Sequence, residues 1–501
     1  MCAPTPTLQS CIPFPLREDD LVDVVEKAKD WAIMHGAAMR SKQEFNPDAL
    51  QFAPFILTPS SFPRVEFQKA VALQPVLNEL IHAVAHDSAF LFETLKSTVK
   101  VDDFTRSLID IYRTVLDEGI AQPISLGLLR SDLMLETRCN NECSEPANPL
   151  NAYCCWKQVE INTIASGFGH LGPSSKSLQS YILKELGHRD KLGNLPENKA
   201  LSGLCDAMVE AWKLQKRPKA AILFVVEDVT YNICDQRFHE FYIREHHPDV
   251  LVVRQTLTEI HRAWRLGPDR ELLLRVHEGE PEVEASVVYF RAGYEPGHYH
   301  GPDEWAARLL VERSRAIKCP SIQYHLAGTK KVQQALARPD VLRRFVGADE
   351  AKIDAIRDVF TGLYSLDPDE GGVEAVALAL ANPERFVLKP QREGGGNNVY
   401  GADIPAALNA MSPDERSAWI LMERIFPPLS TGYMIRPGGP SPPPLVQLVS
   451  ELGIFGAIIG CKDEVLYNKQ VGHMLRTKLS TANEGGVAAG LGALDSPYLI
   501  D

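Results

Sequence analysis

The first 120 residues carry apolar side chains at helical spacing. One stripe follows the acidic run at 18–20, and acidic residues favour the first turn of a helix. Its members are Leu21, Val24, Val25, Ala28, Trp31 and Ala32. A second helix is expected after Ser60 and Ser61, and a third near 104–116. These stripes predict buried helix faces, so the N-terminal part of the chain is expected to be largely helical.

From residue 219 onward, short apolar runs of strand length alternate with helix-like segments. The runs span 220–226, 250–253 and 285–290. Strands that alternate with helices predict a parallel α/β domain. Later strands are expected at 385–389, 418–423 and 446–459. We therefore expect an α/β chain in three parts, which span residues 1–218, 219–327 and 328–501.

Composition and charge narrow the classes of function. A chain of 501 residues has room for about three domains. Its 52 basic and 65 acidic residues give a net charge of −13, so we expect no nucleic-acid partner. No apolar run approaches the ~20 residues of a membrane span, and residues 1–20 lack the pattern of a secretory signal. With ten cysteines, the chain is expected to be cytoplasmic, with reduced thiols.

A glycine run after a predicted strand is the first candidate for chemistry. Lys389 ends the strand, and Glu393 precedes three glycines at 394–396. Glycines let backbone N–H groups approach a phosphate, the lysine adds positive charge, and the glutamate can bind a metal that bridges phosphates. A run of three glycines alone is more often a flexible hairpin loop. The flanking Lys389 and Glu393, with asparagines at 397–398, favour a nucleotide site.

Two oxygen-bearing side chains stand two residues apart in the strand predicted at 159–162. Glu160 and Asn162 would point to one face of that strand, an arrangement that suits Mg²⁺. A solvated strand face is the competing interpretation, and these residues alone leave both open.

The segment 167–172 reads G-x-G-x-x-G, the fingerprint of dinucleotide-binding proteins. It lies between a strand-like run and the helix-like segment 177–186, and Asp190 stands near the position of a ribose-binding acid. Against this interpretation, a central parallel strand is continuously apolar, whereas the preceding strand carries Glu160 and Asn162. A dinucleotide oxidoreductase is therefore an alternative function of a different class.

Three basic residues are candidates for binding anions. Arg476 and Lys478 share one face of an extended segment and can clamp a phosphoryl group, with a loop of small residues following at 484–490. A basic surface turn beside a mobile loop fits the pattern equally well. Arg291 follows the last strand of the middle domain, where ligands of open α/β sheets bind, and is a candidate for a substrate carboxylate.

Histidine and cysteine patterns do not predict a zinc site. His298 and His300 lack a third ligand at suitable spacing, so solvated loop histidines are expected. The clustered cysteines contain no C-x-x-C pair, and reduced surface thiols are expected there. They are Cys139, Cys143, Cys154 and Cys155.

The longer motifs resemble those of the eukaryotic glutathione synthetases, a family of the ATP-grasp superfamily. They occur in the family's order and span most of the chain. The matching stretches are LGLLRSD (126–132), VEINTI (159–164), NICDQR (232–237), FRAGY (290–294), LAGTKKVQQ (326–334), FVLKPQREGGGNNVYG (386–401), ILME (420–423), SELGIFG (450–456) and VGHMLRTK through GGVAAG (471–490). The resemblance implies an ATP-grasp fold with an inserted parallel α/β substrate-binding domain and a helical N-terminal part that contributes the E-x-N metal strand.

The resemblance also implies an activity, namely an ATP- and Mg²⁺-dependent ligase that joins γ-glutamylcysteine to glycine as a cytosolic homodimer. In such enzymes ATP phosphorylates the cysteinyl carboxylate, and the glycine amine attacks the acyl phosphate. This chemistry requires positioning and charge stabilisation and no nucleophilic side chain. The loops at 290–300, 391–401 and 482–490 are similar to the family's moving lids, which would exclude water.

Carried over by position, the resemblance assigns residues to each task. Two Mg²⁺ ions would be held by Glu160, Asn162 and Glu393. ATP would be bound by Glu160, Lys330, Lys389, Glu393, Gly394, Gly395, Asn398, Tyr400, Met422, Glu423, Arg424, Ile425, Glu451, Lys478 and Glu484. The substrates would be bound by Arg130, Ala165, Ser166, Gly167, Asn232, Gln236, Arg291, Tyr294, Arg476, Val487 and Ala488, the last two at the glycine end. The catalytic residues would be Arg476, Lys330 and Lys389.

Two departures from the family pattern affect the dipeptide site. Ala165 and Gly167 stand where the family has a Ser-x-Ser pair, and Ala292 stands where it has Asp. At the amine site, Ala488 and Ala489 resemble the glycine users, because β-alanine users carry Leu-Pro there. A ligase for another small amine and a non-catalytic binding protein are further alternatives.

Overall fold

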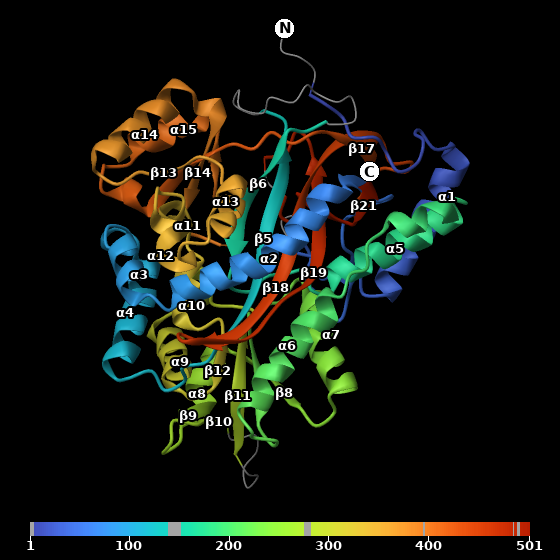
Figure 1. The fold of residues 1–501 in the computed structure, drawn as a ribbon. Helices are drawn as coiled ribbons and strands as arrows, with labels where there is room; N and C mark the ends of the chain where they lie inside the picture. Colours follow the sequence, from blue (N-terminus) through green and yellow to red (C-terminus); the bar gives the residue numbers. More distant parts are fainter. Residues whose placement is uncertain (1–4, 139–151, 275–281, 394–395, 484, 488–490) are drawn as a thin grey trace.

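The computed structural model describes residues 5–138, 152–274, 282–393, 396–483, 485–487 and 491–501. A seven-stranded sheet runs through its centre (Figure 1). Its spatial order is β17 (Ser430–Ile435), β3 (Phe55–Ile56), β20 (Gly492–Asp495), β19 (Glu464–Leu479), β18 (Leu445–Cys461), β5 (Ser125–Glu136) and β6 (Cys155–Asn162). Strands from the segments 1–218 and 328–501 therefore lie side by side in one sheet.

Both faces of this sheet are buried, as β18 shows. Ile454 and Ile458 pack into one hydrophobic cluster with α2 (Arg64–Ala85), whereas Phe455 and Ala457 pack into another with α6 (Ala200–Leu214). Alternate residues of a strand point to opposite faces, so a strand covered on both sides is continuously apolar. The strand predicted at 446–459 is confirmed with slightly wider bounds.

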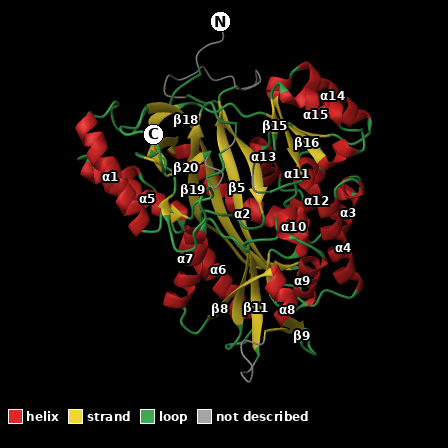
Figure 2. Cartoon of the chain, turned by 180° about the vertical axis from the view of Figure 1, so that it is seen from behind, coloured by secondary structure: helices red, strands yellow, loops and turns green. Residues whose placement is uncertain are grey.

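Helices lie on both sides of the central sheet (Figure 2). On the side of α2 they are α3 (Ser88–Leu95), α4 (Asp103–Asp117), α10 (Ile322–Ala327), α11 (Lys330–Leu336), α12 (Val341–Val346) and α13 (Glu350–Val359). Helix α1 (Glu18–Met34) contacts helix α5 (Leu171–Glu185). The helices predicted at 104–116 and after Ser61 are confirmed, and the second of these begins at Arg64.

A second sheet forms from the middle of the chain and lies at the lower end of the view in Figure 1. Its elements are β7 (Ala221–Val226), α7 (Ile233–His246), β8 (Leu251–Thr256), α8 (Leu257–Ala263), β9 (Trp264–Leu266), β10 (Leu272–Leu274), β11 (Val283–Phe290), α9 (Pro302–Arg313) and β12 (Ile317–Cys319). Strands β8, β7, β11 and β12 are parallel, as predicted. The sheet is nevertheless mixed, because β9 and β10 pair antiparallel through the short connection 267–271, which has no room for a crossover.

A third, four-stranded sheet carries its own small core and stands apart in the upper left of Figure 1. It has the order β13 (Leu363–Ser365), β16 (Trp419–Glu423), β14 (Phe386–Pro390) and β15 (Val399–Tyr400), packed against α14 (Glu370–Ala381) and α15 (Asp403–Ala410). Two small pairs complete the fold, β1 (Ala38–Met39) with β2 (Gln51–Phe52) and β4 (Ser60–Pro63) with β21 (Pro497–Ile500).

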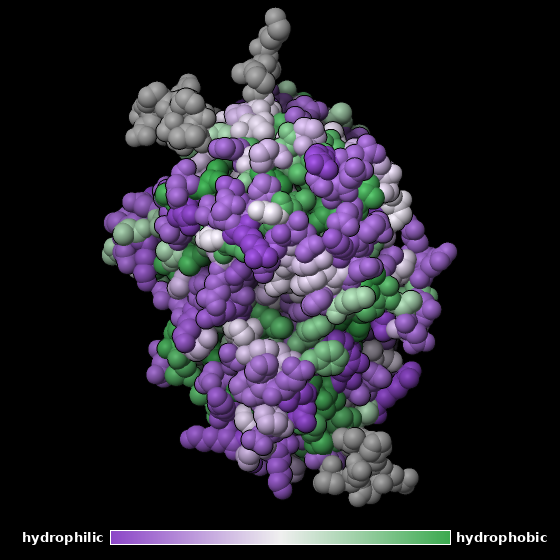
Figure 3. All heavy atoms as spheres, turned by 90° about the vertical axis from the view of Figure 1, so that its right-hand side faces the viewer, coloured by the Kyte–Doolittle hydropathy of each residue, from purple (hydrophilic) through white to green (hydrophobic). Residues whose placement is uncertain are grey.

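The surface is largely polar on the face drawn in Figure 3, with apolar residues scattered between. Among the helices that the structure describes, none is both long and apolar enough to span a membrane.

One expectation about the cysteines is wrong, since Cys154 is disulfide-bonded. Cys155 is half-buried, and Cys139 and Cys143 lie outside the described residues.

Candidate active site

Three elements bring charged side chains together where β6 meets the third sheet. The Lys330 ammonium at the start of α11 lies 3.0 Å from Glu160 Oε2 on β6 and 2.8 Å from Glu393 Oε1 after β14. Lys389 Nζ on β14 donates a hydrogen bond of 3.0 Å to the carbonyl of Val159. Four residues that the sequence predicted for one site thus meet, although up to 233 positions separate them (Glu160 to Glu393, 393 − 160).

Burial and neighbouring charges shift the pKa values of the two carboxylates in this centre in opposite directions. Burial opposes ionisation of Glu160, yet the charges of Lys330, Lys389 and Arg476 hold its pKa well below its usual range. Burial raises the pKa of Glu393, against the attraction of Lys330 and with a contribution from the charge of Glu160. Glu160 is therefore a permanent anion, while the charge of Glu393 depends more on the cation beside it.

The predicted metal ligands fit a divalent cation by the chemistry of their donors. Glu160 and Glu393 offer two carboxylates that already attract a cation, the ammonium of Lys330. Asn162 Nδ2 donates to Asp132 Oδ2 at 2.9 Å, which leaves its carbonyl oxygen as the third hard ligand. Within the described ranges, no three His, Cys, Asp or Glu side chains form a metal site, and the predicted set contains only two of that kind.

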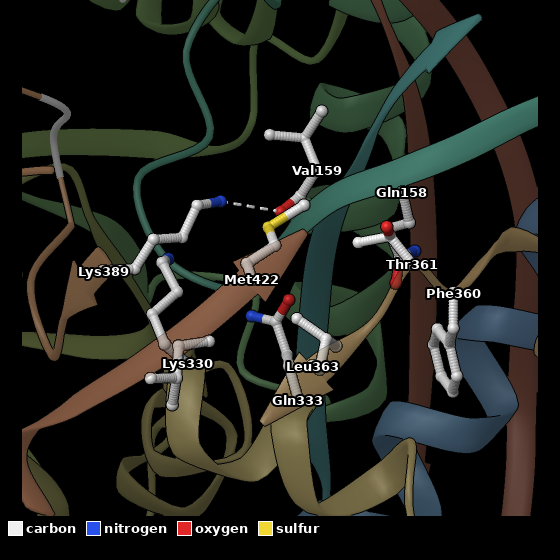
Figure 4. A pocket seen from close by; sticks show the side chains of 10 residues that line it. Gln158, Val159, Lys330, Gln333, Phe360, Thr361, Leu363, Lys389 and Met422 are labelled. Carbon is white, nitrogen blue, oxygen red and sulfur yellow. Dashed lines mark hydrogen bonds between the residues drawn. The ribbon is translucent and has the colours of Figure 1, made fainter. Parts of the chain in front are cut away.

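A small pocket lies beside the two lysines (Figure 4). Lys330 and Lys389 lie at one end of the view, Met422 lies in the middle, and Phe360 and Gln158 lie at the other end. Its lining is Gln158, Val159, Lys330, Gln333, Phe360, Thr361, Leu363, Lys389, Ile420 and Met422. An apolar slot that ends at two cations suits a base with a phosphate chain.

Sequence reasoning found only three members of this lining, namely Lys330, Lys389 and Met422. The others come from β6, from α11, from β16 and from residues 360–363, where β13 begins. Strand β16 is continuously apolar from Trp419 to Met422, and Ile420 lies two residues before Met422, on the same face. Nothing local marks Phe360 or Leu363 as pocket residues, because their position depends on how the third sheet packs.

The remaining predicted nucleotide residues lie around the third sheet and the tip of β19. Tyr364 Oη donates to the Glu423 carboxylate at 3.1 Å, and Arg424 Nη2 donates to Asn483 Oδ1 at 3.2 Å. Lys478 Nζ donates to the Asn483 carbonyl at 2.6 Å, so Arg424 and Lys478 meet at one residue. Ile425 is half-buried directly after β16, and Asn398 Nδ2 donates to Tyr400 Oη at 3.2 Å. Outside the described residues are Gly394, Gly395, Glu484 and Ala488.

Arg476 lies opposite Glu451 in the register of β19 and β18, and its Nη2 donates to Glu451 Oε1 at 2.5 Å. Its Nε is buried and has no hydrogen-bond partner among the described residues. Glycine at 485 passes close by, because a Cβ there would lie 3.7 Å from Arg476 Nε. Val487 is buried in a hydrophobic cluster with Phe55 rather than lying open. Arg476, the cation predicted beside this loop, therefore lies next to it, and its Nε is available to donate a hydrogen bond to a ligand.

The predicted dipeptide residues gather at the carboxyl ends of β7 and β11. Gln236 Nε2 donates to Glu227 Oε2 and to Asn232 Oδ1, both at 3.0 Å, and Tyr294 Oη donates to Glu227 Oε1 at 3.4 Å. Arg254 Nη2, in the C-terminal half of β8, donates to Gln236 Oε1 at 3.0 Å. Sequence reasoning missed Glu227 and Arg254, although Glu227 directly follows the parallel strand β7, where ligands of such sheets bind.

Arg291 does not lie open for a carboxylate as expected. It is 2% exposed, its Nη2 contacts Asp235 Oδ2 at 3.1 Å, and its Nη1 donates to the Ser166 carbonyl at 3.2 Å. Its Nε is buried, and no atom in the part of the chain that the structure describes accepts a hydrogen bond from it. The backbone at Ala165 has a positive φ of 50°, a conformation rare for a residue with a side chain.

The dinucleotide interpretation of 167–172 is wrong in structural terms. Asp235 accepts hydrogen bonds from the N–H groups of Phe168, His170 and Leu171, at 3.0, 3.0 and 3.3 Å. Those amides are the ones that a pyrophosphate would need, and a side-chain carboxylate occupies them. The preceding strand β6 also pairs antiparallel with β5, so no parallel βαβ unit exists there. His300 is exposed beside Asp228, as the solvated-loop interpretation predicts. That interpretation is wrong for His298, whose side chain is only 12% exposed and whose Nδ1 accepts from the Gly293 N–H at 3.1 Å.

Together, a small sheet over an apolar slot, two lysines at its end and a pair of carboxylates on the facing strand define an ATP-grasp ligase. A family model, described as eukaryotic glutathione synthase, ATP binding domain, matches residues 18–499. The chain therefore belongs to the eukaryotic glutathione synthetases, a family of ATP-dependent ligases. The resemblance and the fold class predicted from the sequence are confirmed.

Individual relatives agree with this assignment. Glutathione synthetase of Homo sapiens is 42% identical over 487 residues, which cover 96% of this chain and 98% of the human one. The chloroplastic glutathione synthetase of Arabidopsis thaliana is 38% identical and covers 96% of this chain and 86% of its own. Among solved structures, a glutathione synthetase-like effector of Globodera pallida superposes with a TM-score of 0.76 at 24% identity, over 98% of this chain and 100% of that chain, and supports the fold alone.

Proposed function

We propose that this protein is a glutathione synthetase, which joins γ-glutamylcysteine to glycine with ATP. The observation that carries the proposal is Lys330, held between Glu160 and Glu393 at the end of the apolar pocket. Cations and metal-binding carboxylates at the end of a pocket are the groups that stabilise a phosphoryl group during its transfer. ATP phosphorylates the cysteinyl carboxylate, and the glycine amine then displaces phosphate.

Nucleotide and metal binding follow from the site. The adenine binds beside Met422 of the pocket lining, with the two lysines toward the phosphates. Glu423 and Ile425, which follow Met422 in the chain, bind it too. Glu160, Asn162 and Glu393 would hold two Mg²⁺ ions, which would neutralise phosphate charge. Gly394, Gly395, Asn398, Tyr400, Arg424, Glu451, Lys478 and Glu484 complete the ATP site.

Charge stabilisation is the catalytic task of the chain. The γ-phosphoryl group passes from one oxygen to another and spreads negative charge over its own oxygens. Lys330, Lys389 and Arg476 present three positive charges toward it, and the unpartnered Nε of Arg476 is a donor for the acyl phosphate. The side chains hold the reactants and exclude water, and none of them acts as a nucleophile.

The substrates occupy the edge between the first and second sheets. Arg130, Ser166, Gly167, Asn232, Gln236, Arg291 and Tyr294 bind the dipeptide, while Val487 and Ala488 bind glycine. The loops 290–300, 391–401 and 482–490 close over the site and protect the acyl phosphate from hydrolysis. The protein acts as a cytoplasmic homodimer.

Tripeptide formation from ATP, γ-glutamylcysteine and glycine, followed by mass spectrometry, tests the proposal. With ¹⁸O in the cysteinyl carboxylate, one label should appear in the released phosphate, because that oxygen attacks phosphorus and leaves with it. Absence of tripeptide, or phosphate without label, would refute the ligase mechanism.

Site variants and a panel of amines test the assignments within this function. Lys389→Ala should lose phosphate binding, and Glu393→Gln should weaken Mg²⁺-dependent turnover; wild-type ligation by either would refute its role. Turnover with β-alanine that matches turnover with glycine would favour the alternative amine specificity. NADH should show no binding in a fluorescence titration.

A further inference from the structure

One carboxylate outside the predicted site contacts three of its parts. Asp132 on β5 accepts from Arg130 Nε at 2.6 Å and from Arg130 Nη2 at 2.7 Å. Asn162 Nδ2 donates to the same carboxylate at 2.9 Å, and Arg476 Nη2 lies 3.9 Å from it. Asp132 is 0% exposed, so it acts on ligands only through these neighbours.

We propose that Asp132 is a positioning residue that sets the geometry of the dipeptide arginine, the metal-binding amide and the phosphoryl arginine at once. This inference rests on the proposed function, because Arg130, Asn162 and Arg476 take their tasks from it. The motif at 126–132 includes Asp132 but does not indicate its role, since that role depends on β6 and β18 lying on either side of β5.

Asp132 decides which atom of Asn162 faces a cation. A carboxamide presents an oxygen on one side and an NH₂ group on the other, and only the oxygen binds Mg²⁺. A carboxylate accepts hydrogen bonds and donates none, so Asp132 at 2.9 Å holds the NH₂ group of Asn162, aided by the more distant Arg130 carbonyl at 3.4 Å, and leaves its oxygen outward. An amide at position 132 has a donor of its own and weakens this restriction.

Asp132 also fixes the guanidinium of Arg130 in two directions. Two of its nitrogens fork onto the carboxylate, and the third, Nη1, donates to the Gly167 carbonyl at 2.9 Å. In the register of β18 and β5, Gly453 lies opposite Asp132. A Cβ there would lie 2.9 Å from both Arg130 Cδ and Asp132 Oδ1, so the glycine provides the space for this pair.

The test is the near-isosteric variant Asp132→Asn, assayed by binding as well as by turnover. Calorimetry gives the dissociation constant of γ-glutamylcysteine. Electron paramagnetic resonance of free Mn²⁺ gives metal binding in the presence of a nonhydrolysable ATP analogue. Both constants should rise between about tenfold and a hundredfold, the usual range for losing a charged hydrogen bond or an outer-shell partner of a metal ligand.

The matched control is Glu312→Gln on α9. Glu312 is also a buried carboxylate held by one arginine, with Arg308 Nε and Nη2 at 3.2 and 3.0 Å from Oε1. Its loss should lower the melting temperature and leave both binding constants unchanged. If Asp132→Asn behaves like this control, the positioning role is refuted.

A second variant decides the matter if Asp132→Asn does not fold. Gly453→Ala keeps every charge but displaces the Arg130–Asp132 pair through its new Cβ. Both constants should again rise, and unchanged constants would refute the proposal. A wild-type protein that binds no dipeptide refutes the proposed function instead, so the two failures are distinguishable.

Discussion

Replacing Lys330 by methionine removes the cation that now separates two carboxylates. The side chain is 5% exposed, and its ammonium contacts Glu160 and Glu393 at 3.0 and 2.8 Å. Methionine matches the length of the lysine stem, so the change leaves the packing nearly intact and isolates the charge.

The expected loss of unfolding free energy is about 3–5 kcal/mol at pH 7, the usual cost of removing one partner from a buried ion pair. Glu160 still faces Lys389, whereas Glu393 loses its closest cation. In the variant the pKa of Glu393 therefore rises further above its unfolded value of about 4.3. A carboxyl group with a raised pKa makes stability fall as the pH rises, so the difference from wild type should be larger at pH 7 than at pH 5.

The assay is urea unfolding followed by tryptophan fluorescence at pH 5 and pH 7, first with a chelator and then with Mg²⁺. A divalent cation can replace the lysine between the carboxylates, so Mg²⁺ should restore more stability to the variant than to wild type.

The control for this prediction is Lys331→Met. Lys331 is also buried and contacts Asp367 at 2.7 Å, but Asp367 keeps Ser97 and Ser365 as hydroxyl donors. We expect destabilisation without a Mg²⁺ response. For Lys330→Met, a loss of unfolding free energy below about 1 kcal/mol would contradict the geometry of the carboxylate pair. A loss that depends on neither pH nor Mg²⁺ would contradict it as well.

Three further predictions concern other parts of the fold. Burial raises the pKa of Asp495 to about 6, so its contribution makes the free energy of unfolding fall as the pH rises from about 4 to 6. In urea unfolding, Asp495→Asn should remove this pH dependence, and an unchanged pH dependence would contradict the prediction. Gly472→Ala places a Cβ 2.4 Å from Ala200 Cα and should cost about 1–3 kcal/mol or more in thermal unfolding, whereas an unshifted midpoint would show that α6 yields. Met422→Ala removes apolar contact in the pocket and should weaken binding of an ATP analogue about tenfold to a hundredfold by calorimetry; equal affinity would place the base elsewhere.

The sequence predicted those parts of the site whose signal is local. Glu160 and Asn162 follow from a two-residue period in one strand, and Lys389 with Glu393 follow from a strand that ends in a glycine run. Asp132 could not be found this way, because its contact with Asn162 joins neighbouring strands 30 residues apart. The cross-strand register that creates the contact contains a bulge, which no periodicity predicts.

Helix α5 shows the same limit for the fold. The apolar pattern placed a helix at 177–186, whereas the structure begins it at Leu171. The first turn contains glycine and proline, which are weak helix formers, and its free N–H groups are capped by Asp235 from a distant helix. Helix propensity is judged from the residues of the segment itself. It therefore cannot predict a helix start that is stabilised by a capping residue from another element.

The central sheet has a consequence for the order in which the protein is made. Strands β5 and β6 leave the ribosome early, yet their neighbours β18, β19 and β20 follow only after residues 163–444. Until then the inner edge of β5 has no partner and its apolar faces are uncovered, a state that invites aggregation. A nascent chain interrupted anywhere before β20 lacks Arg476 or its supporting strand, so we expect truncated products to be inactive and to depend on chaperones.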